Sequence, residues 1–186
     1  MIKKAAIASV CNIRFGLYAE PSPTGTAGYL QVRQFTDDGK LTNETDEFLD
    51  VDDKVKPHLL VDGDVLFVGK GNRLFSWRYH NTGTSVASSI FFVLQPDKNI
   101  LSPDYLVALL NAPQSKAAFQ QLGSGTNIYS IRKSELGAFE IPLPPMYQQM
   151  RIAALAKLHQ QEIELSQKLL SQKQKLYSAI ISKIIK

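Results

Sequence analysis

The stretch YQQMRIAALAKLHQQEIELSQKLLSQKQKLYSAIISKIIK, residues 147–186, contains no glycine and no proline in 40 residues. It is rich in Gln, Leu, Lys, Ala and Ile, which are all compatible with a helix. The sequence therefore predicts one long C-terminal helix, about 60 Å long at 1.5 Å per residue. Because a compact body formed by the rest of the chain would be very roughly 40 Å across, we expect the helix to project beyond it.

Apolar residues recur along this segment at spacings of three and four, which is typical of one helix face. A projecting apolar face needs a partner helix, and folding back over its own body is the alternative. Because His159, Ser166 and Lys173 interrupt one candidate seam, we expect an antiparallel pair or a bundle rather than a long regular two-stranded coil. The side chains expected to be buried in this self-association are Leu155, Leu158, Leu165, Leu169, Leu176 and Ile180.

The composition is that of a soluble globular protein, with 44% hydrophobic and 20% charged residues in a chain of 186. No apolar run approaches the roughly 20 residues of a membrane-spanning helix. The stretch 5–11 has six apolar residues, fewer than the roughly 7 to 15 of a signal-peptide core. We therefore expect a cytoplasmic protein. One cysteine and three scattered histidines form no pattern for a disulfide or a structural zinc site.

Positive charge is concentrated in the predicted helix. Residues 151–186 hold seven Lys/Arg and two Asp/Glu (net +5), whereas residues 1–150 hold 14 and 15 (net −1). Within the second set, the segment 37–53 has eight acidic side chains and one lysine. Since most charged side chains lie at solvated surfaces, a pI of about 9.1 does not by itself indicate a nucleic-acid partner.

Residues 1–145 have the pattern of short strands and helices. Strand patterns cover 29–35, 64–68, 74–79, 87–94 and 139–143. Ser102 and Pro103 are typical of a helix start, and a second short helix is expected over 114–122. The Pro- and Gly-rich run 21–28 predicts an exposed loop, and 69–73 predicts a tight hairpin connection. We therefore expect an α/β (α+β) domain over 1–145 and one long α-helix over 146–186.

Sequence motifs for catalysis fail on their spacing. Gly63 and Gly69 have five residues between them where a phosphate-binding loop has four, and Gly71 stands where that loop has Ser or Thr. Leu74 occupies the third glycine position of a dinucleotide fingerprint. No histidine lies near a serine or cysteine in an arrangement typical of nucleophilic catalysis. The sequence favours a binding protein without a catalytic residue, metal or cofactor.

Several segments, taken in order, resemble the specificity subunit of type I restriction-modification systems. The best-matched stretch is GSGTNI at 123–128, IR at 131–132, Leu136, IPLPP at 141–145, QQ at 148–149 and Ile152. DGDVLF at 62–67, Gly16 and YLQVR at 29–33 are similar to earlier parts of the family. Gln148 departs from the pattern, since the family usually has Glu there.

The resemblance implies a noncatalytic subunit that chooses the double-stranded DNA site for a methyltransferase subunit and a restriction subunit. Full-length members carry two target recognition domains and two spacer helices, whereas this chain has one of each. It therefore resembles a half subunit that acts as a homodimer on a palindromic, two-part site. The alternatives are a paralogous half as partner, a fragment of a split or phase-variable locus, an interaction scaffold that does not discriminate DNA, and an unrecognised nuclease or lyase.

The resemblance places DNA recognition in the N-terminal part of the chain, where we expect three groups of side chains. Arg reads guanine and Asn or Gln reads adenine, whereas Lys and Ser commonly hold phosphates. The first group surrounds the 69–73 hairpin, the second follows the 21–28 loop and the third precedes the last strand. In that order, the candidates are Lys70, Asn72, Arg73, Arg78 and Tyr79; Tyr29, Gln31 and Arg33; and Asn127, Tyr129, Ser130, Arg132 and Lys133.

Overall fold

A four-stranded antiparallel sheet forms the centre of the body. The structure, a computed structural model, describes residues 3–42, 46–81, 83–122 and 129–185. The central sheet has the order β2-β9-β5-β7, formed by β2 (Cys11–Phe15), β9 (Phe91–Pro96), β5 (Val65–Val68) and β7 (Ser76–Arg78). The strands expected over 64–68 and 74–79 are thus confirmed, and they pair with each other.

A second sheet has the order β4-β3-β8, formed by β4 (Phe48–Leu49), β3 (Ala27–Leu30) and β8 (Ser85–Ala87). The strand expected over 87–94 is therefore wrong as one element. Its first residue ends β8 in this sheet, a turn follows, and the remainder belongs to β9 in the central sheet. Two sheets divide the segment because β8 pairs with β3 whereas β9 pairs with β2 and β5.

The strand expected over 29–35 is shorter than the pattern indicated. β3 ends at Leu30, and Val32–Gln34 form a 3₁₀ helix, η1. The side chain of Gln34 causes this turn to close, because its Oε1 accepts a hydrogen bond of 2.9 Å from the Gln31 backbone N–H. The ring of Phe35 then enters the core, where it contacts Phe75 and Phe91. A second 3₁₀ helix, η2, spans Lys56–His58.

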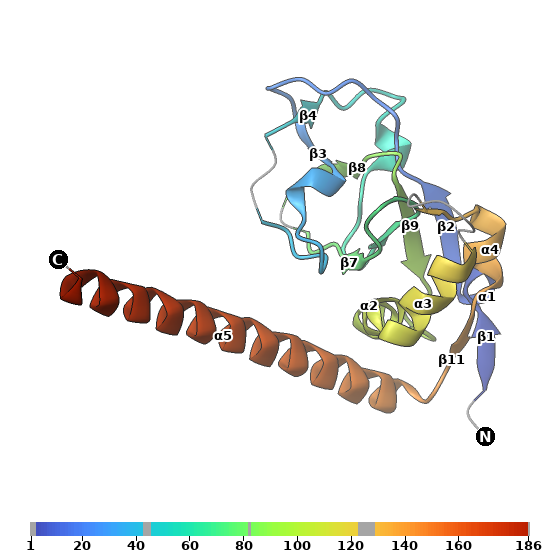
Figure 1. Ribbon diagram of the computed structural model, residues 1–186. Coiled ribbons are helices and arrows are strands. Elements are labelled where there is room, and N and C mark those ends of the chain that lie inside the picture. Colours follow the sequence, from blue (N-terminus) through green and yellow to red (C-terminus); the bar gives the residue numbers. More distant parts are fainter. Residues whose placement is uncertain (1–2, 43–45, 82, 123–128, 186) are drawn as a thin grey trace.

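The central sheet lies between two layers, and alternate side chains of β5 face opposite ways, as a strand requires. Val65 and Phe67 belong to a core cluster with the helices, whereas Leu66 and Val68 belong to a cluster on the opposite face. The helical layer contains α1 (Ile7–Val10), α2 (Pro103–Asn111), α3 (Pro113–Leu122) and α4 (Lys133–Ala138) (Figure 1). The expected fold class, an α/β (α+β) body followed by a long helix, is confirmed.

The helix starts predicted from the sequence are also confirmed. Ser102 is the N-cap of α2, and its hydroxyl accepts a hydrogen bond of 3.5 Å from the Tyr105 N–H. Pro103 occupies the first helical position, where a missing N–H costs nothing. Pro113 begins α3 in the same way, one residue before the expected start.

The two ends of the body meet in a small sheet that precedes the long helix. β1 (Lys4–Ala6) pairs antiparallel with β11 (Glu140–Pro142), and the Leu143 N–H donates to the Lys3 carbonyl at 2.7 Å. The last strand expected from the sequence is thus present. Because this strand is held by the start of the chain, the direction in which the following helix leaves the body is set by residues far away in sequence. A further pair joins β6 (Lys70–Gly71) to β10 (Tyr129–Ser130).

The long helix α5 spans Met146–Ile184, 39 residues, and extends well beyond the body (Figure 1). Near its start Gln149 is only 1% exposed. Its side-chain Oε1 accepts a hydrogen bond from the Ser102 N–H, and its Nε2 donates to the carbonyls of Ile100 and Pro144, all at 2.9 Å. One amide therefore joins the starts of α2 and α5. We call this set of three hydrogen bonds the Gln149 clasp.

Farther along, α5 touches the body again through polar contacts. Lys40 forms an ion pair of 2.7 Å with Glu164, and Gln160 donates to Asp38 at 2.9 Å. The six apolar side chains expected in self-association remain between 48% and 67% exposed. The alternative that this apolar face folds back over its own body is therefore wrong. In the described ranges, no helix is both long enough and apolar enough to cross a membrane.

The clasp predicts that Gln149→Ala lowers the free energy of unfolding by about 2–4 kcal/mol, since it removes three hydrogen bonds and leaves buried partners unpaired. Gln148→Ala is the matched control, because this neighbouring amide is only half-buried and, among the described residues, its side chain bonds to Tyr147 alone. The control should cost less than about 0.5 kcal/mol. Guanidinium denaturation measures both, and equal losses would contradict the role of the clasp.

Candidate nucleic-acid interface

Two of the predicted groups are brought together by the β6–β10 pair. Ser130 lies opposite Lys70 and Tyr129 opposite Gly71, and the Ile131 N–H donates to the Gly69 carbonyl at 2.8 Å. The segment 69–73 does connect β5 to β7, as expected, but it also carries a strand partner from far along the chain. Lys70 of the first group and Ser130 of the third group therefore lie opposite each other.

Arg73 joins the second group to this region. Its Nη1 donates to the carbonyls of Val32 and Phe35, at 3.2 Å and 2.7 Å, and its Nε lies 2.8 Å from an oxygen of Asp37. The guanidinium thus satisfies backbone acceptors next to η1 and is half-buried. These bonds assign Arg73 a structural task.

The charges of the second group are neutralised within the protein. Arg33 pairs with Asp46 at 2.9 Å and with Glu47 at 3.0 Å, and Gln31 donates to Glu47. The hydrogen bonds that Arg33 donates to Glu47 and Asp46 raise the pKa of Arg33, and the Arg33 guanidinium lowers the pKa of Asp46. Gln31 and Arg33 would have to leave these partners to contact DNA, so this part of the surface offers little attraction to phosphates.

Tyr29 and Tyr79 are corrected from candidate DNA contacts to core residues. They are 3% and 1% exposed. The Tyr29 hydroxyl donates to the Leu17 carbonyl at 2.8 Å, and the Tyr79 hydroxyl donates to the Gly83 carbonyl. Tyr29 lies in β3, whose four residues are all buried, and Tyr79 directly follows β7. Their position beside basic residues in the sequence did not show which face they occupy.

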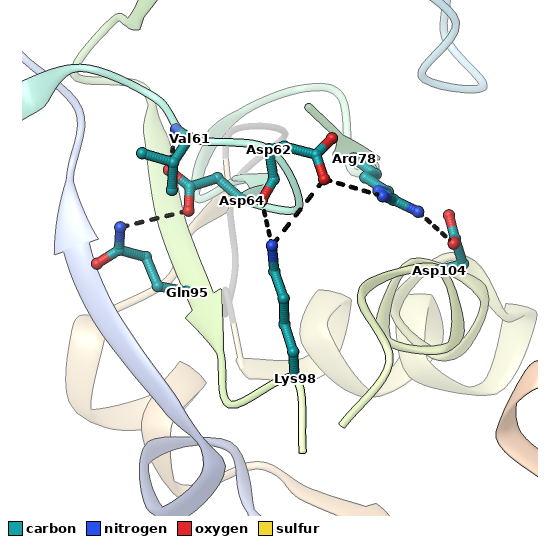
Figure 2. A network of polar contacts seen from close by, with 7 residues as sticks. All are labelled: Val61, Asp62, Asp64, Arg78, Gln95, Lys98 and Asp104. Atoms are coloured by element: carbon teal, nitrogen blue, oxygen red, sulfur yellow. Dashed lines mark hydrogen bonds and ion pairs between the residues drawn. The ribbon is translucent and has the colours of Figure 1, made fainter. Parts of the chain in front are cut away.

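Arg78 lies at the opposite end of the central sheet from Lys70. It pairs with Val65 at the start of β5, whereas Lys70 follows the end of that strand. Figure 2 shows its guanidinium between two carboxylates, with Nη2 3.3 Å from Asp62 and Nη1 on Asp104. Because Asp104 is in the first turn of α2, Arg78 ties β7 to that helix. It does not share a surface with Lys70.

The rest of this polar network is also structural. Asp64 is 2% exposed, and its carboxylate accepts from the Val61 N–H at 3.1 Å and from Gln95 at 3.3 Å (Figure 2). Burial raises the pKa of Asp64, although Arg14 lies 3.5 Å away. Lys98 donates to the Asp62 carbonyl at 2.6 Å. These contacts close the loop between η2 and β5.

Burial raises the pKa of the Cys11 thiol to about 12, so it is not a nucleophile at neutral pH. Across the described parts of the chain, no three His, Cys, Asp or Glu side chains are grouped as metal ligands.

A group of available cations lies around the β6–β10 pair. Lys70, Arg132 and Lys133 are exposed, and none of them forms an ion pair with another side chain of the described residues. Asn72 and Ser130 are exposed beside them. We call the surface formed by Lys70, Asn72, Ser130, Arg132 and Lys133 the basic edge. The candidate Asn127 lies outside the described residues, and for Tyr129 only the strand is described.

Sequence reasoning missed Phe15 and undervalued Gly16 at the end of β2. Phe15 is 52% exposed, and its register partner is Phe92. A Cβ on Gly16 would lie 2.1 Å from the Ser88 carbonyl oxygen, so only glycine allows the close approach of these two backbones. An aromatic residue at a strand end followed by glycine was the available signal.

Comparison with known proteins agrees with this architecture. Residues 65–173 match the family described as the type I restriction modification DNA specificity domain. Because the match covers more than half of the chain, the chain belongs to this family. The resemblance inferred from the sequence is thus confirmed.

Solved structures share the fold of this chain. The HsdS subunit from Thermoanaerobacter tengcongensis has a TM-score of 0.66 and 19% identity, over 88% of this chain and 38% of that one. The type I restriction-modification S subunit from M. genitalium has a TM-score of 0.62 and 19% identity, over 93% and 42%. A structure from a study of type I restriction-modification complex assembly gives 0.65 and 20%, over 92% and 41%. The chain spans about two-fifths of the length of these proteins.

The two ends of the sheet should respond differently to mutation. If the basic edge holds phosphates, Lys70→Ala and Arg132→Ala should each reduce the slope of log affinity against log salt by about 1, with little change in melting temperature. Arg78→Ala is the matched control, and it should destabilise the fold while leaving that slope unchanged. Fluorescence anisotropy with duplex DNA at several salt concentrations measures the slopes. A larger slope change in Arg78→Ala would contradict the assignment.

Proposed function

We propose that this chain recognises a DNA sequence for a type I restriction-modification complex and has no catalytic activity of its own. Its family membership supports this role. The observation that carries it is the basic edge, where β6 and β10 bring exposed cations from two distant segments together. Unpaired Lys and Arg side chains are the groups that hold DNA phosphates, whereas neighbouring polar side chains can read base edges.

The proposed working form is a homodimer that acts in the cytoplasm. α5 carries six apolar side chains that are 48–67% exposed, and each contributes about 1.5–3 kcal/mol if a partner helix buries it. A second copy related by a two-fold axis would place an antiparallel helix on this face. The alternative partner for this apolar face of α5 is a paralogous half subunit.

Two bodies held at the ends of paired helices would read two copies of one sequence. The proposed target is therefore palindromic and bipartite, with a nonspecific gap set by the helix length. A methyltransferase subunit and a restriction subunit would be directed to that site.

An interaction scaffold or a partial subunit is the second candidate. The internal pairing of Arg33, Arg73 and Arg78 favours it, because three arginines of the recognition body are held by its own carboxylates. Such a protein would assemble with the modification subunit without discriminating DNA, or would need another half to do so.

Light scattering and methylation mapping separate these candidates. A mass near twice 20.7 kDa, together with methylation at one split palindrome when a methyltransferase subunit encoded next to the chain is added, supports the main proposal. A monomer that directs methylation only with a different half subunit supports the partial form. Assembly with the methyltransferase but no site preference supports the scaffold.

Helix pairing predicts that Leu169→Asp yields monomers, because a carboxylate would be buried in the apolar interface. Gln167→Asp is the matched control, since it adds the same charge two residues away, on the other side of the helix. Light scattering at equal concentrations should show half the mass for the first variant and the parental mass for the second. An unchanged mass for Leu169→Asp would refute pairing through this face.

A further inference from the structure

Phe15 presents an aromatic ring to solvent from a rigid position. It ends β2 and is 52% exposed, whereas its neighbour Phe92 is 4% exposed. The two ring centroids are 5.0 Å apart with an interplanar angle of 40°. One side of the Phe15 ring is therefore held by a buried partner, while the remainder is free to contact a ligand. An exposed aromatic ring with a fixed orientation loses little conformational entropy on binding.

The Phe15 ring lies near the basic edge because its neighbour Phe92 packs on Gly69. A Cβ on Gly69 would lie 2.2 Å from the Phe92 ring, so the Phe92 ring packs directly over the Gly69 backbone. The Gly69 N–H donates to the Ile90 carbonyl at 3.1 Å, and its carbonyl accepts from Ile131 at 2.8 Å. Lys70 follows directly in the chain, and Ser130 lies opposite it. The exposed ring and the exposed cations thus occupy the same end of the central sheet.

A single apolar ring beside unpaired cations suits the major groove of DNA. Only thymine presents a methyl group there, and Phe is one of the side chains that contact it. Lys70 and Arg132 are exposed and lack ion-pair partners among the described side chains, so they can hold the flanking phosphates. Cations without ion-pair partners among the described residues at this end of the sheet favour a polyanion over an apolar protein surface as the occupant.

We propose that Phe15 is a specificity-determining residue that contacts the 5-methyl group of a thymine in the recognised sequence. The proposal rests on the proposed function, because it requires that the basic edge faces DNA. It adds an apolar base contact to an interface whose other candidate members are polar or charged.

The test compares DNA with and without thymine methyl groups. Duplexes that bind the complex of this chain with its methyltransferase subunit are selected from a random library. The selected pool is then amplified either with thymidine or with deoxyuridine triphosphate, so that the two products differ in the 5-methyl group alone. We expect the parent to bind the uracil pool about four-fold more weakly for each recognition body, the factor for burying one methyl-sized group.

Phe15→Ala should bind the thymine pool as weakly as the parent binds the uracil pool, and should not distinguish the two. Tyr18→Ala is the control, since it removes an aromatic ring that is 82% exposed and should retain the parental discrimination. Phe15→Leu keeps an apolar contact with Phe92 and should retain part of the discrimination between the thymine and uracil pools. Melting temperatures and affinity for unselected duplex show that each variant is folded.

Three outcomes overturn the proposal. Equal binding of both pools by the parent, or full discrimination by Phe15→Ala, would refute the methyl contact while an enriched pool still upholds sequence recognition. Failure to enrich any pool would refute the proposed function, and the role of Phe15 with it.

Discussion

The Gln149 clasp is the constraint on which the arrangement of this protein depends. One buried amide satisfies the N-cap backbone of α2, the Ile100 carbonyl just before α2 and the Pro144 carbonyl just before α5. Because every hydrogen-bonding atom of that amide side chain is used, the first turn of α5 has one favourable position on the body. Because the helix is continuous over 39 residues, the position of its first turn sets the orientation of the whole helix. The apolar face of the helix is left exposed.

The body divides its charges between structure and binding. The acidic segment pairs with Arg33 and Arg73, while Asp62 and Asp104 hold Arg78. These pairs close loops around the two sheets. A group of exposed cations without such partners among the described residues lies at the basic edge, although the net charge of residues 1–150 is close to neutral.

Strong local signals in the sequence were sufficient for much of the fold. The absence of Gly and Pro over forty residues predicted α5, and Ser102 with Pro103 predicted the start of α2. The pattern over 87–94 failed because two sheets divide it. Periodicity shows that a segment prefers an extended backbone, but it does not show which partner strand supplies the hydrogen bonds.

The sequence by itself determined the family, the class of fold and the long amphipathic helix, since these depend on local propensity and on the order of short motifs. Tertiary structure decided which candidate residues share a surface. It buried Tyr29 and Tyr79, moved Arg78 to the far end of the sheet and placed Phe15 at the same end of the sheet as Lys70. Burial, ion pairing and strand register arise from contacts between segments distant in sequence, and these contacts leave no local pattern in a single chain.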